Sequence, residues 1–285
     1  MPNIFKSLEY RLIKQHYGTQ TAKPSGVPLI EQIHDGLMIL DFLFVGEYTY
    51  AREAYCLHPL FQSDEQLGKT VRRHAKTISM TRDRHGRLDG LSLVLVMEYR
   101  NIANQYLSHR SIDSLDDIAL SPLFQVNHML MADKVRSRKD FELYHEQTHP
   151  RSAELKLYFK NWLTRLGISE PLYQYWKQAL IQREKWQFLP ELSNGNEARQ
   201  ELVVYVFRDT ETKGHFKFDL FSFEQYKLLH THILDYDDGG FRIYWDHPNT
   251  SGYWQEQHYI IGTSVNGESY RGMKEDWRID FSEWI

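Results

Sequence analysis

Through most of the first 190 residues, apolar side chains recur every three or four positions, which is the spacing of one face of an α-helix. One such stripe runs along Leu29, Ile33, Leu37, Leu40 and Phe44. The pattern predicts helices at residues 7–17, 28–44, 50–60, 65–80, 91–107, 122–144, 152–166 and 170–188. Gly and Pro residues between several of these segments favour their separation into individual helices.

The pattern changes after the polar segment Ser193-Asn194-Gly195-Asn196, which is the best candidate for a linker. Short runs rich in branched and aromatic residues then predict strands at 202–207, 241–245, 258–262 and 277–281, with a helix at 223–234. We therefore expect a mainly α protein with a small β-rich C-terminal region, α+β overall. The helical domain is expected over residues 1–192 and the β-rich domain over 196–285.

The composition and net charge of the chain limit the classes of function that it could have. The chain has 285 residues, of which 41% are hydrophobic and 25% charged, as in ordinary globular proteins. A net charge of −4 predicts no general affinity for nucleic acid. No apolar run approaches the roughly 20 residues that a membrane helix needs, and no secretory signal is evident. The single cysteine, Cys56, excludes an internal disulfide and is expected to be a buried thiol. These features predict a soluble, cytoplasmic protein without a membrane partner.

Two short segments carry the strongest functional signal. Leu57-His58-Pro59 ends the helix expected at 50–60, and Ala132-Asp133-Lys134 lies within a later apolar helix. Together they resemble two metal-binding corners of the HD-domain phosphohydrolases, over about residues 25–165. In that family a His on one helix, a His-Asp pair on the next and an Asp on a later helix bind a divalent metal. The resemblance implies an HD-like helical bundle and hydrolysis of a phosphate ester by metal-activated water.

Residue by residue, His58 matches the His of the His-Asp pair and Asp133 matches the distant Asp. The position of the first His is Gln32, and the position of the paired Asp is Pro59, which offers no ligand. His34 can take the place of Gln32 as the metal ligand only if the helix is offset from this alignment, because two residues turn a helix by about 200°. The resemblance thus implies a site for Mn, Mg, Fe or Zn formed by His58, Asp133 and either His34 or Gln32.

The same resemblance implies further roles nearby. Asp64 and Glu65 follow His58 where some family members carry an acidic catalytic pair, so they are candidates to orient the attacking water. The expected substrate is a nucleotide or related small phosphate ester. Arg72, Arg73, Lys76 and Arg100, or the later cluster Arg136, Arg138 and Lys139, could hold its phosphate. For both clusters the competing interpretation is a solvated helix face.

The helix expected at 91–107 carries polar residues in an apolar context. Glu98, Asn101 and Gln105 share one side at helical spacing, and Arg100 and Asn104 lie close to them. Polar groups in such a helix must find partners or face a cavity. Glu98, Arg100, Asn101 and Asn104 are therefore candidates for substrate binding. The alternative is that they tether neighbouring helices.

A second hypothesis follows from Gln32 and Pro59: the bundle has lost its chemistry, binds no metal, and is an interaction module or pseudoenzyme. His58 then hydrogen-bonds in the core, and Asp133 pairs with Arg136 or Arg100. A protein partner would contact the aromatic C-terminal region, which contains Trp245, Tyr253, Trp254 and Tyr259.

Two other patterns suggest metal sites. His145-Glu146-Gln147-Thr148-His149 matches the H-E-x-x-H signature of zinc metallopeptidases, with Glu154 and Glu170 as candidate third ligands. Pro150 directly after it disfavours helical geometry at His149. The C-terminal region also holds a loose group of candidate ligands, namely His230, His232, Asp246, His247 and His258.

Overall fold

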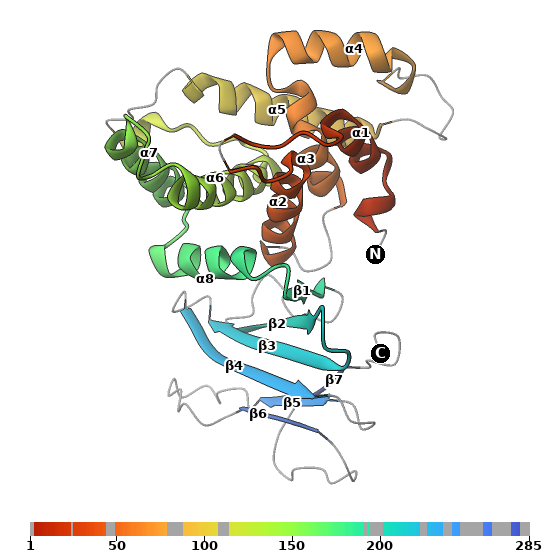
Figure 1. Ribbon diagram of the computed structural model, residues 1–285, viewed down its shortest axis with the longest axis vertical. Helices are drawn as coiled ribbons and strands as arrows, with labels where there is room; N and C mark the ends of the chain where they lie inside the picture. The colour runs from red at the N-terminus through yellow and green to blue at the C-terminus, as the bar shows by residue number, and fades with distance from the viewer. Residues whose placement is uncertain are drawn as a thin grey trace. The chain divides into compact units, whose positions relative to one another are not determined.

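The structure of the chain is a computed structural model that describes residues 3–23, 25–43, 49–78, 88–107, 114–190, 193, 202–222, 227–235, 241–245, 259–263 and 275–279. It describes the backbone alone for residues 49, 73–78, 105–107, 202, 227, 229, 230, 232, 234 and 235 and for the strands from 241 onward. The chain forms two compact units. One comprises Met1–Ile181 with Asn196–Ala198, and the other Gln182–Gly195 with Arg199–Ile285. Among the described residues, the α-helices lie in the first unit and the strands in the second (Figure 1), which confirms the mainly α protein with a β-rich C-terminal region.

The helices of the first unit follow the apolar stripes of the sequence. They are α1 (Leu8–Tyr17), α2 (Leu29–Leu43), α3 (Thr49–Phe61), α4 (Asp64–Ile78), α5 (Gly90–Leu107), α6 (Phe124–Tyr144), α7 (Ser152–Arg165) and α8 (Glu170–Ile181), with short 3-10 turns η1 (Ile4–Lys6) and η2 (Leu115–Asp117). Of the α-helices, only α8 differs much from its predicted bounds, because Trp186–Phe188 forms strand β1 instead of prolonging α8. The second unit therefore begins at Gln182, before the linker predicted from composition. None of the described helices combines the length and apolar character of a membrane span.

Helix α6 is the centre of the helical unit. It packs against α2, α3, α5, α7 and α8, and its residues Val126, Met129, Leu130 and Val135 are fully buried. The same surroundings bury the charged side chains of Asp133, Lys134 and Lys139. Because an unpaired charge in such a place is very costly, the fold requires a network of compensating partners around α6.

Helices α2 and α3 approach each other closely at Gly36. A methyl group at this position would overlap the Cε1, Cζ and Oη atoms of Tyr55, which is completely buried on α3. Gly36 therefore provides the space in which the Tyr55 phenol lies between the two helices. This placement directs the phenol toward α6, where the buried charges are.

The second unit contains two antiparallel sheets. The first has the order β1-β2-β3-β4, with β1 (Trp186–Phe188), β2 (Leu202–Asp209), β3 (His215–Ser222) and β4 (Lys227–Asp235). The second has the order β6-β5-β7, with β5 (Phe241–Trp245), β6 (Tyr259–Thr263) and β7 (Glu275–Ile279).

The helix predicted at 223–234 is wrong, because most of that segment is strand β4. Its backbone pairs with β3, Phe216 opposite Leu234 and Phe218 opposite His232. Strand β3 was not predicted, since nearly all of its side chains are buried and it lacks the alternation of a half-exposed strand. Pairing with this strand outweighs the helical spacing of apolar residues in the 223–234 segment.

Candidate functional site

His58 lies buried in the last turn of α3, and the next residue, Pro59, is inside the helix. Proline has no backbone N–H, so it cannot donate the usual helical hydrogen bond to the carbonyl four residues earlier, which is that of Tyr55. His58 Nδ1 takes this acceptor at 2.6 Å. Because a carbonyl oxygen only accepts, Nδ1 carries the proton and Nε2 of the neutral ring is left as an acceptor.

Asp133 occupies the middle of α6 and is held by cations of its own helix. Arg136 Nη2 donates to Asp133 Oδ1 at 2.9 Å, and Lys134 Nζ donates to Oδ2 at 3.2 Å. The Ser137 hydroxyl donates to Oδ1 at 3.4 Å. Both carboxylate oxygens of Asp133 thus have partners within the chain. This is the pairing with Arg136 that the second hypothesis predicts.

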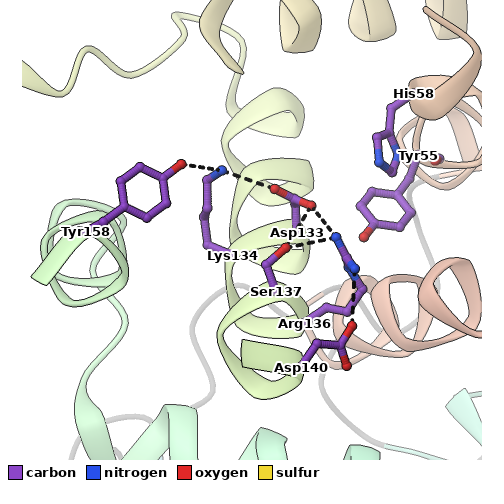
Figure 2. Close-up of polar contacts among 8 residues, drawn as sticks. All are labelled: Tyr55, His58, Asp133, Lys134, Arg136, Ser137, Asp140 and Tyr158. Carbon is purple, nitrogen blue, oxygen red and sulfur yellow. Dashed lines mark hydrogen bonds and ion pairs between the residues drawn. The ribbon is translucent and has the colours of Figure 1, made fainter. Parts of the chain in front are cut away.

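His58 and Tyr55 of α3 face the Asp133–Arg136 pair (Figure 2). Burial lowers the pKa of His58 to about 4, against the opposing effect of the Asp133 carboxylate. Burial by itself would raise the pKa of Asp133, but Lys134 and Arg136 beside it hold that pKa far below its ordinary value. At neutral pH the site therefore contains a neutral imidazole and an ionised carboxylate.

The charges around Asp133 continue into a network that joins three helices. Arg136 Nη1 donates to Asp140 Oδ2 at 3.3 Å, and Lys139 Nζ lies 2.8 Å from both Asp140 Oδ1 and Asp35 Oδ2 of α2. On the other side, Lys134 Nζ donates to the Tyr158 hydroxyl of α7 at 3.1 Å. Figure 2 shows Lys134 and Arg136 extending from α6 in different directions around Asp133. Burial by itself would lower the pKa of Arg136 and of Lys139, but their acidic partners Asp133, Asp140 and Asp35 raise both pKa values, so both residues stay charged.

The other two candidate ligands lie elsewhere on α2. His34 Nδ1 is 3.0 Å from Glu31 Oε2, and its Nε2 is 2.8 Å from the Tyr10 hydroxyl of α1. Gln32 is half-buried. No hydrogen bond or ion pair between described residues joins His34 or Gln32 to His58 or Asp133. The contacts of the described residues thus do not join either candidate to His58 and Asp133, and a metal site completed by one of them stays a prediction.

The predicted catalytic pair is at the surface. Asp64 and Glu65 begin α4 with side chains 95% and 78% exposed. Asp64 pairs with Arg100, and Glu65 pairs with Lys69 one turn later. The two acids therefore act as first-turn residues of a helix, where negative charge is favourable, and they do not face the buried Asp133.

The structure describes the first predicted phosphate cluster only in part, whereas the second is paired with acidic side chains. Arg72 is exposed and donates to the Gly68 carbonyl of its own helix, while the side chains of Arg73 and Lys76 lie outside the described part. In the second cluster every cation has acidic partners. Arg136 and Lys139 belong to the network around Asp133, and Arg138 donates to Glu142 at 2.7 Å and to both carboxylate oxygens of Glu170 at 2.8 Å.

Three of the candidate polar residues of α5 contact neighbouring segments. Glu98 accepts a hydrogen bond of 2.9 Å from the Ser121 hydroxyl just before α6, and Arg100 pairs with Asp64 of α4. Asn104 donates to the Gln62 carbonyl at 3.1 Å, whereas Asn101 is exposed. The contacts of Glu98, Arg100 and Asn104 are those expected for the alternative of helix tethering, and a substrate-binding role of this face stays a prediction.

The described residues do not fit a divalent metal. No three His, Cys, Asp or Glu side chains among them are grouped so that they could hold an ion. At the centre, Asp133 already forms ion pairs with two basic side chains, Lys134 and Arg136. The other polar groups that meet there are the Arg136 guanidinium, whose Nε has no hydrogen-bond partner among the described residues, and the Tyr55 phenol, which burial keeps protonated. Neither is a ligand that a divalent cation prefers.

The zinc-peptidase pattern is not on a helix. Helix α6 ends at Tyr144, and His145 to Thr148 form the turn that follows. Glu146, the expected base, pairs with Lys156, and Glu154 and Glu170 pair with Arg151 and Arg138. The geometry that the H-E-x-x-H signature requires, two His on one helix face, is therefore missing from this segment.

The remaining sequence signals fall mostly beyond the described part of the chain. Asp246, His247, Tyr253, Trp254 and His258 lie outside the described residues. Trp245 and Tyr259 are opposite each other in β5 and β6, where the backbone alone is described. Cys56 is buried as expected, and burial raises the pKa of its thiol.

Several residues of the network escaped the sequence analysis. Tyr55, Asp35, Asp140, Ser137 and Tyr158 were not singled out, although Asp133, Arg136 and Asp140 follow one another at i, i+3 and i+7 on α6. Acids and bases at these spacings face each other on a helix. That signal, in so buried a helix, could have indicated an internal network.

No protein-family model matches the chain, and comparison with curated proteins and with solved structures gives no significant match. The functional inference therefore rests on the geometry of the buried site.

Proposed function

We propose that the helical unit is a non-catalytic, HD-like binding module, and that its buried centre holds the helices together instead of activating water. The observation that carries this proposal is the pairing of Asp133 with Lys134 and Arg136. A carboxylate that ligates a divalent metal must present its oxygens to the ion. Here both oxygens are directed to nitrogen donors of the same helix.

The positions of the other candidates support the same conclusion. An HD-type reaction needs several ligands and an acid or base around one point. In this chain His34 bonds to Tyr10, and Asp64 and Glu65 are exposed on α4. Such a bundle is suited to present fixed surfaces, and we propose a protein partner that contacts the aromatic C-terminal region.

The experiment is a metal and hydrolysis assay on the purified full chain. Metal content is measured directly, and a panel of nucleotides and phosphate esters is tested with Mg²⁺, Mn²⁺, Fe²⁺ or Zn²⁺, with and without chelator. We expect no bound metal and no hydrolysis above that of Asp133→Asn. Hydrolysis that is abolished by chelator, by Asp133→Asn and by His58→Ala would show that the module is an enzyme.

The binding role has its own test. A partner that copurifies with the full chain should be lost from the double variant Tyr253→Ala/Trp254→Ala if the aromatic region provides the contact. A matched variant in the helical unit, Tyr144→Ala, changes one exposed aromatic residue at the end of α6. Equal loss in both variants, or none in the first, contradicts the assignment of the contact to the C-terminal region.

A metal-dependent phosphohydrolase is the second candidate, and the tautomer of His58 favours it. Metal-binding histidines commonly donate one ring N–H to a carbonyl or carboxylate, which fixes the ring and leaves the other nitrogen as ligand. His58 is held in this way by the Tyr55 carbonyl. For this function Arg136 would have to leave Asp133, and the hydrolysis assay described above distinguishes the two candidates.

A further inference from the structure

We propose that the guanidinium of Arg136 takes the place of a divalent cation at the centre of the helical unit. This inference deepens the proposed function and rests on it. It assigns to Arg136 a definite role, which is to supply permanently the positive charge around which the side chains of α3 and α6 are arranged. It also predicts that removal of this side chain uncovers an affinity for metal that the natural chain does not have.

The contacts of Arg136 are those of a bridging cation. One guanidinium nitrogen, Nη2, donates to Asp133 at 2.9 Å and to the Ser137 hydroxyl at 2.8 Å. The other, Nη1, donates to Asp140 at 3.3 Å. From the opposite side, the Tyr55 phenol and the neutral His58 ring of α3 face the same group (Figure 2). The guanidinium therefore bonds to two carboxylates and a hydroxyl, and the Tyr55 phenol faces it from α3.

The charges of this centre balance with Arg136 and not without it. The ion pairs of α2 and α6 around Asp133 connect three basic residues, Lys134, Arg136 and Lys139, with three acidic residues, Asp35, Asp133 and Asp140. A divalent ion added to this set would leave uncompensated positive charge in a buried place, which is unfavourable. With Arg136 replaced by an apolar residue, the set has an excess of one negative charge, so a divalent ion would bring it to +1 instead of the +2 reached with Arg136 present, and Asp133 loses its shorter ion pair.

The atoms of Asp133 and His58 that become free in such a variant are suitable ligands for a transition metal. Asp133 would then offer a carboxylate oxygen and His58 its Nε2, since Nδ1 is held by the Tyr55 carbonyl. Oxygen and imidazole donors suit Mn²⁺, Co²⁺ and Zn²⁺. Water molecules commonly complete the coordination of an ion held by few protein ligands. Pro59 explains why His58 brings no neighbouring carboxylate to this group.

The experiment compares the wild type with Arg136→Met by titration with Mn²⁺, followed by electron paramagnetic resonance. We expect saturable binding in Arg136→Met that is about tenfold or more tighter than any binding by the wild type, since the loss of a single supporting contact already changes metal affinity by 10–100-fold. The double variants Asp133→Asn/Arg136→Met and His58→Gln/Arg136→Met should each lose this gain. Arg138→Met, which removes an arginine paired with Glu142 and Glu170, is the matched control and should behave as the wild type.

Three results would overturn the inference. These are equal Mn²⁺ binding by wild type and Arg136→Met, a folded Arg136→Met without Mn²⁺ binding, or a gain that persists in the Asp133 double variant. If Arg136→Met is unfolded, circular dichroism with and without Mn²⁺ decides: refolding by metal supports the inference, and no refolding overturns it. Hydrolysis by the wild type would refute the proposed function separately, because that assay does not involve the variant.

Discussion

His58 Nδ1 donates a hydrogen bond of 2.6 Å to the carbonyl of Tyr55, one turn earlier in α3. The bond uses an acceptor that Pro59 leaves free, since proline has no N–H to donate. Pro59 thus contributes to the structure through the acceptor that it leaves free. It allows the imidazole to be fixed as a neutral ring beside Asp133 and Arg136.

The neutral state of His58 predicts a dependence of stability on pH. Its pKa is about 4 in the folded chain, compared with 6.5 for an ordinary His. The unfolded chain thus binds the proton first as the pH falls, so this stabilisation is complete above pH 6.5 and is lost toward pH 4. The contribution is on the order of 3 kcal/mol. Urea unfolding between pH 7 and pH 4 measures it.

A matched pair of variants separates the contributions to this pH dependence. His128 has a pKa of about 4 for the same reason, burial, and contributes in the same direction. His58→Gln should therefore remove part of the pH dependence and His128→Gln another part. NMR of the His58 ring should show the Nδ1–H tautomer at neutral pH. A His58 ring that titrates near pH 6.5 contradicts the burial and the contacts described here.

Asp133→Asn tests the buried network. The change leaves Lys134 and Arg136 with one acidic partner fewer in a buried place, and breaking such a pair typically costs about 3–5 kcal/mol. Asp64→Asn is the matched control, because its ion pair with Arg100 involves a side chain that is 95% exposed, and it should leave stability almost unchanged. Chemical denaturation of both variants gives the comparison. Equal effects of the two changes would show that the Asp133 pairs are not structurally important.

Gly36→Ala tests the close approach of α2 and α3. The added methyl group overlaps the Tyr55 ring, and overpacking of this kind typically costs about 1–3 kcal/mol. Gly68→Ala is the control. Gly68 is also inside a helix, α4, but has open space around the position of a methyl group. Alanine there should stabilise the chain by about 0.5–1 kcal/mol. Thermal unfolding of both variants distinguishes the effects by sign, and a stabilising Gly36→Ala would refute the described packing.

The ion pair between Asp35 and Lys139 joins α2 to α6 at 2.8 Å, and both side chains are buried. A double-mutant cycle with Asp35→Asn and Lys139→Gln measures its coupling energy, which should be about 1.5–3 kcal/mol for a buried, charged hydrogen bond. The same cycle on the exposed pair Glu65–Lys69 should give a much smaller value. A coupling energy near zero for the buried pair would show that α2 and α6 are held by apolar contacts alone.

The sequence was sufficient to predict most helices, because each carries an apolar stripe that packs on a neighbour. It was insufficient for β3 and β4. Strand β3 is buried on both faces, and β4 depends on pairing with β3, a contact between distant residues. The proximity of His58 and Asp133 was an expectation of the resemblance to the HD-domain phosphohydrolases, and helical spacing alone does not provide it.

The state of the site was harder to predict. Whether Asp133 binds a metal or Arg136 depends on side-chain positions around α6, and helical spacing allows both. The hydrogen bond of His34 to Tyr10 depends on how α1 packs against α2. That packing is a tertiary contact, and no short pattern in the sequence encodes it.

The most direct measurement is a crystal structure of the wild-type chain grown with an excess of Mn²⁺, with anomalous data collected for manganese. We expect the Arg136 guanidinium between Asp133 and Asp140, and no anomalous peak within ligand distance of Asp133 and His58. A manganese peak coordinated by Asp133 and His58, with Arg136 displaced, would contradict the proposal that this chain supplies its own cation.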